Sequence, residues 1–134
     1  MIPKFRAWLK AEKQMIDVEF LDLSHKVLIG KHWEFGMTEA IKFDDVDIMQ
    51  YTGLFDSQPE PEEIYKDYIV KRTSLMLGGR DFVGVVKMLE GCWVIDNGEE
   101  AINLWTEVDE NIVIGNIFEN PELLEHPDFR KEHK

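Results

Sequence analysis

Hydrophobic and polar residues alternate along much of the chain in short segments, which is the period of a β-strand with one buried face. The clearest case is residues 15–23 (MIDVEFLDL), where Ile16, Val18 and Phe20 face one way and Asp17 and Glu19 the other. Similar patterns predict further strands at 26–30 with a continuation at 32–36, and at 47–54, 65–77, 81–89, 92–96 and 111–118. Residues 37–47 are irregular and acidic, so they are expected to form a loop.

Glycine and proline mark the predicted turns. Glu90-Gly91 between two strand segments indicates a β-hairpin, and Gly84 in its first arm suggests a bulge or a tight bend. Residues 55–63 hold two prolines and four carboxylates, which predicts an exposed loop. Residues 98–108 fit either a helix or a strand, and a short strand after a turn is preferred.

The stretch 111–125 (NIVIGNIFENPELLE) predicts how the fold ends. Gly115-Asn116 allows a bulge or bend in the closing strand. Asn120, Pro121 and Glu122 are typical of a helix N-cap, its first position and an acid in its first turn, and Pro127 ends that short helix.

These elements predict a mainly β protein, a β-rich α+β chain with little helix. Their order fits an SH3-like small β-barrel over residues 48–134, with a short C-terminal helix and tail. Residues 1–47 are then an N-terminal β-rich segment.

The formal net charge is −12 over 134 residues, and it is unevenly distributed. Residues 1–14 carry +3, and residues 88–129 hold eleven acids without Lys or Arg. Most of this surface would repel a phosphate backbone, so direct nucleic-acid binding is not expected. The excess of acid is interpreted first as a property that favours solubility rather than as a specific function.

The expected location is the cytoplasm. The N-terminus lacks the apolar region of a signal peptide, and no apolar run approaches the length of a membrane span. The single Cys92 cannot form an internal disulfide, which agrees with a reducing compartment. Cys92 also opens an apolar strand, so it is interpreted as a small buried hydrophobic residue.

No catalytic, cofactor-binding or metal-binding residue is predicted, and no cofactor. Asp44, Asp45 and Asp47 lack the spacing of a calcium loop, so a solvated loop is preferred. The histidines pair only seven residues apart, without the partners of a zinc site, and are interpreted as surface residues: His25, His32, His126 and His133. Residues 77–82 (LGGRDF) are interpreted as a plain turn rather than an anion site.

Aromatic residues are dense enough to supply a peptide-binding groove. This set comprises Trp33, Phe35, Tyr51, Phe55, Tyr65 and Tyr68. For Trp33 and Phe35, a place in the core is preferred.

Five segments resemble the YopX-like family of phage and prophage proteins of Gram-positive bacteria. They are 4–8 (KFRAW), 49–56 (MQYTGLFD), 63–70 (EIYKDYIV), 84–95 (GVVKMLEGCWVI) and 113–124 (VIGNIFENPELL). The resemblance implies a largely β protein with an SH3-like barrel and no established biochemical activity.

One departure from the family pattern lies in the third segment. Asp67 stands where the family usually has Gly, and Tyr68 where it usually has Asp. The resemblance implies that this pair shapes the entry into a strand, so a different turn is expected here.

Three functions stay open. The first is a non-enzymatic protein-binding module that recognises a host or phage protein. The second is an acidic mimic of nucleic acid that inhibits a host DNA-binding protein, and the third is an undetected hydrolase. Self-association into a homo-oligomer is also compatible with so small a fold, because its sheet edges need covering.

Overall fold

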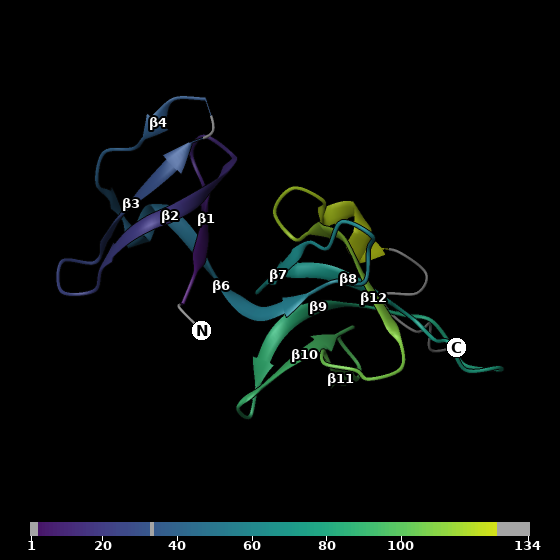
Figure 1. Cartoon of the computed structure of the whole chain (residues 1–134). Helices are drawn as coiled ribbons and strands as arrows, with labels where there is room; N and C mark the ends of the chain where they lie inside the picture. The colour runs from purple at the N-terminus through teal and green to yellow at the C-terminus, as the bar shows by residue number, and fades with distance from the viewer. Residues whose placement is uncertain (1–2, 33, 126–134) are drawn as a thin grey trace. The chain divides into compact units, whose positions relative to one another are not determined.

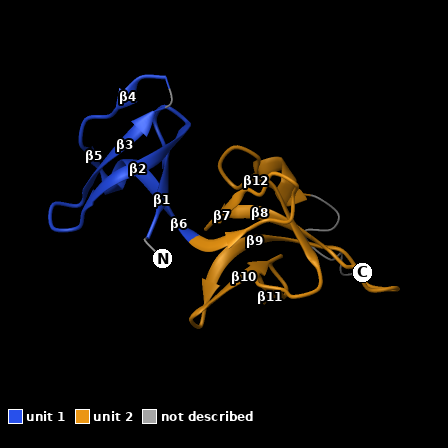
Figure 2. Cartoon of the chain, in the orientation of Figure 1, with its two compact units in different colours: residues 1–51 blue, residues 52–134 orange. Residues whose placement is uncertain are grey.

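The computed structural model describes residues 3–32 and 34–125 and shows an antiparallel β protein (Figure 1). The chain divides into two compact units, residues 1–51 and 52–134 (Figure 2). The predicted β-rich class is therefore confirmed. In the described ranges, no helix is long and apolar enough to cross a membrane.

The first unit is a sheet with the strand order β4-β3-β2-β1-β6, in which β5 also pairs with β3. Its core consists of Ala7, Leu9, Ile16, Leu28 and Val46. The elements are β1 (Phe5–Leu9), β2 (Gln14–Asp22), β3 (Val27–His32), β4 (Gly36–Met37), β5 (Ile41–Lys42), the 3-10 helix η1 (Phe43–Asp45) and β6 (Val46–Phe55).

The alternation predicted along β2 breaks in the middle of the strand. The β2–β3 register shifts between Val18 and Phe20, as a β-bulge does. Val18 and Leu21 therefore pack on the core, whereas Phe20, expected to share the face of Ile16, is exposed.

The second unit contains a five-stranded sheet with the order β11-β10-β9-β8-β12. A core cluster of Ile69, Val83 and Val85 lies under residues from the end of the chain, Ile114, Ile117, Leu123 and Leu124. The elements are β7 (Glu63–Tyr65), which pairs with β6, then β8 (Tyr68–Thr73), β9 (Phe82–Leu89), β10 (Cys92–Asp96), β11 (Ala101–Asn103), β12 (Glu110–Asn116) and the 3-10 helix η2 (Pro121–Glu125).

Both sheets have open strand orders, so the predicted SH3-like barrel is not confirmed. In the part of the chain that the structure describes, no strand pairing closes either sheet into a barrel.

Left-handed backbone occurs in the predicted hairpin turn and in a turn that interrupts a predicted strand. Glu90 and Gly91 join β9 to β10 with φ of 51° and 83°, so the hairpin is confirmed. The strand predicted over 65–77 is instead divided into β7 and β8 by a turn in which Asp67 has φ 70°. Glycine adopts this conformation at the least cost, and Asp is among the residues that tolerate it.

Gly84 was predicted to mark a bulge or a tight bend; the structure has no bulge there, but a close approach of β9 to β10. The β8–β9 register runs without a shift through Gly84, opposite Val70. A Cβ at Gly84 would lie 2.8 Å from the backbone nitrogen of Asp96 in β10, closer than real contacts allow. The strand preferred over 98–108 is present as β11.

The bulge and the helix predicted for 111–125 are both present. The β8–β12 register shifts between Val113 and Gly115, and η2 follows at Pro121. Asn120 has the predicted N-cap position, because its backbone carbonyl accepts from the Leu123 N–H in the first turn of η2 at 3.0 Å. Its side chain differs from a usual N-cap, since Oδ1 accepts from the backbone N–H of Asn116 at 3.2 Å and so stabilises the turn before η2.

Candidate functional site

Two loops at one end of the second unit's sheet expose a group of large apolar side chains. Thr73 at the end of β8 pairs with Glu110 at the start of β12, so residues 74–81 and 104–109 leave the sheet at the same end. Figure 1 shows the β8–β9 loop projecting beyond its strands. We call the exposed group the apolar tip; it comprises Leu75, Met76, Leu77, Trp105 and Val108.

Buried Arg72 on β8 fixes the base of the second loop. Its Nε donates to Asn111 Oδ1 at 2.6 Å, and its Nη2 donates to the carbonyls of Asn103 and Leu104 at 2.7 and 2.9 Å. Asn111 Nδ2 also donates to the Leu104 carbonyl, at 2.8 Å. Burial lowers the pKa of Arg72, and the nearby charge of Asp109 opposes that shift. The guanidinium stays charged, so these are strong hydrogen bonds.

Short-range hydrogen bonds then shape the two loops and join them. Thr106 Oγ1 accepts from the backbone N–H groups of Val108 and Asp109, at 3.3 and 3.2 Å. Asp109 Oδ1 in turn accepts from the backbone N–H of Leu75 at 3.3 Å, which connects one loop to the other. The apolar tip is therefore carried on loops with a defined backbone.

Asp56 and Ser57 cover the outer edge of β12. Asp56 Oδ2 accepts from the backbone N–H of Val113 at 3.0 Å, and Ser57 exchanges hydrogen bonds with the backbone of Asn111. Asp56 Oδ1 also accepts from the backbone N–H of Glu62 at 2.8 Å. Burial raises the pKa of Asp56, but these backbone bonds and one from the Gln58 side chain outweigh it, so the pKa lies below its usual 3.8.

The family model described as YopX protein matches residues 4–125. The chain belongs to the YopX family. This confirms the resemblance predicted from the five segments. A comparison with curated proteins finds no match.

Two solved structures share the fold of this YopX-family chain. Protein EF1440 from Enterococcus faecalis is 28% identical, with a TM-score of 0.60 over 92% of this chain and 99% of that one. Protein yopX from Bacillus subtilis is 17% identical, with a TM-score of 0.63 over 90% of this chain and 95% of that one.

Asp44 and Asp45 line a hollow of about 510 Å³ in the first unit, together with Leu9, Lys10, Ala11, Glu12 and Ile41. Two of these lining residues are joined by a hydrogen bond, in which Lys10 Nζ donates to the Asp44 carbonyl at 3.2 Å. Asp47, predicted in the same solvated loop, belongs to β6 and pairs with Trp8. Across residues 3–32 and 34–125, no group of three or more His, Cys, Asp or Glu could hold a metal ion.

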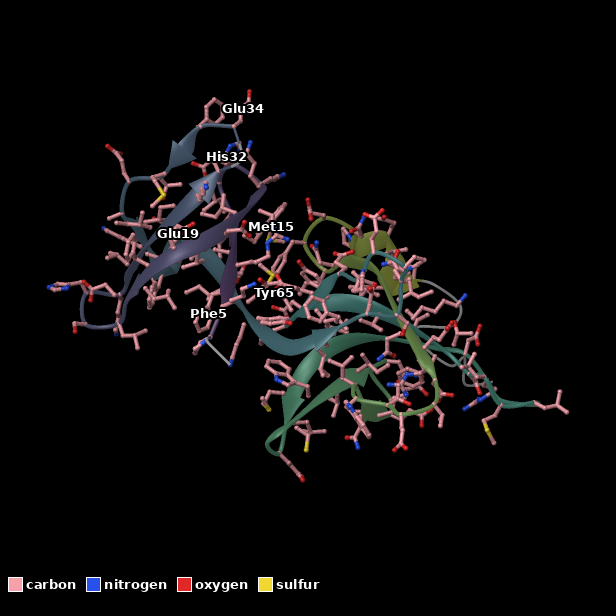
Figure 3. The ribbon with its side chains drawn as sticks, viewed as in Figure 1. Phe5, Met15, Glu19, His32, Glu34 and Tyr65 are labelled. Carbon is pink, nitrogen blue, oxygen red and sulfur yellow. The ribbon has the colours of Figure 1, made fainter. Side chains whose placement is uncertain are left out.

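The histidine prediction holds for His25 and is wrong for His32. His25 is exposed, and its ring Nδ1 lies 2.7 Å from Asp22 Oδ2. His32 is buried at the end of β3, where its Nδ1 accepts from the backbone N–H of Glu34 at 3.0 Å (Figure 3). His126 and His133 lie outside the described residues.

Among the described aromatic residues of the predicted groove, most are buried rather than exposed for binding. Tyr51, Tyr65 and Tyr68 are buried, whereas Phe55 is exposed. The preference for a buried Phe35 was wrong: the residue follows β3 in a turn and its ring stacks on His32, at 4.8 Å between centroids. Trp33 lies outside the described residues.

Cys92 is exposed, so the prediction of a buried hydrophobic residue was wrong. It is the first residue after the Glu90-Gly91 turn, at the tip of the β9–β10 hairpin, where the strands leave the core.

Sequence reasoning missed the apolar tip because residues 74–77 were included in a predicted strand. Leu75, Met76 and Leu77 are three consecutive apolar residues before Gly78-Gly79, which does not fit the alternation of a half-buried strand. This break in the alternation could have indicated that residues 75–77 leave the strand.

Proposed function

We propose that this YopX-family chain is a phage or prophage accessory protein that acts as a non-enzymatic protein-binding module in the cytoplasm of a bacterial host. The observation that carries the proposal is the apolar tip. Its five exposed apolar side chains lie on two loops that a hydrogen bond joins, and exposed apolar groups of this kind mark interaction sites. The tip is also held in place by buried polar bonds, and preorganised surfaces lose less entropy on binding.

A capture experiment with the tagged full chain tests this function. The lysates would come from Bacillus subtilis and Enterococcus faecalis, the organisms of the two structural relatives. We expect the same few proteins to be enriched in replicates and displaced by excess untagged chain. Absence of such enrichment would contradict the proposal, as would turnover of ester or phosphoester substrates by the purified chain, which would favour the hydrolase.

A second candidate is an acidic mimic of nucleic acid that occupies a host DNA-binding protein. Its support is the charge of the second unit, where eight Lys and Arg face eighteen Asp and Glu, a net of −10. Such a surface repels nucleic acid and attracts a protein that binds it.

Competition distinguishes the two candidates. For the mimic, duplex DNA displaces the chain from the captured protein, and the variant Glu90→Lys/Glu122→Lys/Glu125→Lys, which leaves the apolar tip intact, loses capture. These three side chains are exposed. Capture that survives both duplex DNA and charge reversal excludes the mimic and leaves the protein-binding module.

A further inference from the structure

The five side chains of the apolar tip are largely exposed to solvent. The exposed fractions are 60% for Leu75, 67% for Met76, 106% for Leu77, 62% for Trp105 and 59% for Val108. These side chains lie on two loops joined by the hydrogen bond from the Leu75 N–H to Asp109. Their exposure in water is unfavourable, and a partner that covers them gains the free energy of apolar burial.

Acidic side chains surround the apolar tip. Residues 74–81 and 104–110 contain Arg80 as their one base, against Asp81, Glu107, Asp109 and Glu110. Arg80 lies 3.9 Å from Glu100, and Lys71 on the neighbouring strand lies 3.8 Å from Asp81, so nearby acids offset both cations. The rim of the apolar surface is therefore negative.

We infer that the apolar tip is the docking surface for a basic amphipathic helix of a partner protein. This rests on the proposed protein-binding function and specifies its surface and the chemistry of its partner. One face of such a helix offers apolar side chains to Leu75, Met76, Leu77, Trp105 and Val108. Its flanking Lys or Arg side chains meet the acidic rim. Leucine and methionine side chains adapt readily to a helix face.

Charge also disfavours the other occupants. Bacterial membranes carry anionic lipids, which a negative rim repels rather than attracts. A second copy that docked tip to tip would bring two negative rims together, and like charges at an interface are unfavourable. A cationic partner is the occupant that satisfies both the apolar surface and its rim.

Fluorescence anisotropy with a designed peptide tests the inference. The probe is a labelled amphipathic helix of Leu and Lys, about 18 residues or five turns long. We expect the full-length chain to bind it, and Leu75→Ser/Met76→Ser/Leu77→Ser to weaken binding at least about tenfold. Salt should weaken binding further, because the rim contributes through screened charges.

Two further variants test the specificity of the apolar contact and the contribution of the acidic rim. Met88→Ser/Leu89→Ser removes exposed apolar side chains at the opposite end of β9 and should change the affinity less than about twofold. A second tip variant, Glu107→Lys/Glu110→Lys, should weaken binding without loss of the apolar residues. Circular dichroism would confirm that each variant retains its fold.

Several results would overturn the inference. Equal affinity of the triple variant and the parent chain is one, and equal losses in the triple variant and the Met88/Leu89 control is another. Binding to phosphatidylcholine vesicles that depends on the tip would assign it to a membrane. A concentration-dependent mass in light scattering that the triple variant abolishes would assign it to a second copy. If the triple variant still captures the lysate proteins, the docking surface is wrong while the proposed function stands.

Discussion

The two units of the chain differ more in charge than in architecture. Both are antiparallel sheets over small apolar cores. The first unit carries seven Lys and Arg against nine Asp and Glu, a net of −2, whereas the second carries −10. Nearly all of the acidity of the protein therefore belongs to one unit.

The units also differ in what they bury. Among the described residues of the first unit, the buried polar side chain is His32. The second unit buries seven, including Arg72, Asp56 and Asn111. Buried polar groups stabilise a fold when they are hydrogen-bonded. Arg72 and Asn111 bond the base of a loop and Asp56 bonds a sheet edge, whereas the buried Nδ2 of Asn97 has no hydrogen-bond partner. The comparison indicates that the second unit uses polar burial to fix the segments that present the apolar tip.

Loss of the buried guanidinium is expected to give the largest difference between the units. Arg72→Met removes the guanidinium donors to the Asn103 carbonyl and to Asn111 Oδ1 and leaves the Leu104 carbonyl with Asn111 Nδ2, so the free energy of unfolding should fall by about 3 kcal/mol. Arg6→Met in the first unit removes an exposed pair with Asp17 and should cost less than about 1 kcal/mol. Urea titrations would measure both, and equal losses would contradict the contrast.

Asp56 should give the second largest effect, and one that depends on pH. Asp56→Asn replaces an acceptor of several N–H groups with a side chain that is itself partly a donor, at a cost of about 2 kcal/mol near neutral pH. Because the folded pKa lies below the usual 3.8, the charged form stabilises the fold above that pH. This stability is lost as pH falls through the folded pKa.

The pH dependence can be separated from that of the first unit. Unfolding titrations between about pH 6 and pH 2.5 should show a smaller acid-induced loss of stability for Asp56→Asn than for the parent chain. Asp22 also has a lowered pKa, through the backbone N–H and then the side chain of His25, but it is exposed. A parent and an Asp56→Asn variant with the same pH profile would show that Asp56 is not the group responsible.

Removing one comparable hydrogen bond between a side chain and the backbone from each unit should lower the free energy of unfolding by the same amount. Asn120→Ala removes the acceptor of the Asn116 N–H, and Thr38→Val removes the acceptor of the Gly30 N–H. Both residues are half-buried, so each substitution should cost about 1 kcal/mol in thermal or urea unfolding. Partner binding should survive Asn120→Ala, and lost binding at unchanged stability would show that this turn has a direct role.

Glycine substitutions at left-handed turn residues should give the smallest effects. Asp67→Ala should cost about 1 kcal/mol, because alanine tolerates φ of 70° poorly, whereas Asp67→Gly should be close to neutral. Lys13 in the first unit has φ of 57°, so Lys13→Gly should raise the free energy of unfolding by about 0.5 kcal/mol. A loss of stability in both glycine variants would indicate that the side chains outweigh the backbone.

Local pattern predicted the elements whose signals lie within a few residues. The β9–β10 hairpin and the bulge and 3-10 helix of 111–125 follow from their glycines, alternation and Asn-Pro pair. Phe20 was predicted on the buried face of β2, but a bulge turns its side chain to the exposed face. A closed barrel was predicted because alternation identifies strands without specifying how they pair, and the observed pairings leave both sheets open.

The hydrogen bonds that hold the loops of the candidate site could not be predicted from local sequence pattern. Arg72 and Asn111 are 39 residues apart, and Asp56 and Val113 are 57 apart, so no spacing along the chain reveals these bonds. Asp56 lies in a stretch rich in proline and acid that predicts exposure, and its burial depends on β12 from the far end of the chain.

The most direct test of recognition by the second unit is the affinity of the captured partner for two matched variants of the full-length chain. Leu75→Ser/Met76→Ser/Leu77→Ser removes exposed apolar residues of the second unit, and Phe20→Ser/Leu23→Ser/Phe35→Ser removes exposed apolar residues of the first. We expect at least about a tenfold loss of affinity for the former and less than about a twofold loss for the latter, by isothermal titration calorimetry. The reverse order, or equal losses, would contradict the assignment of recognition to the second unit.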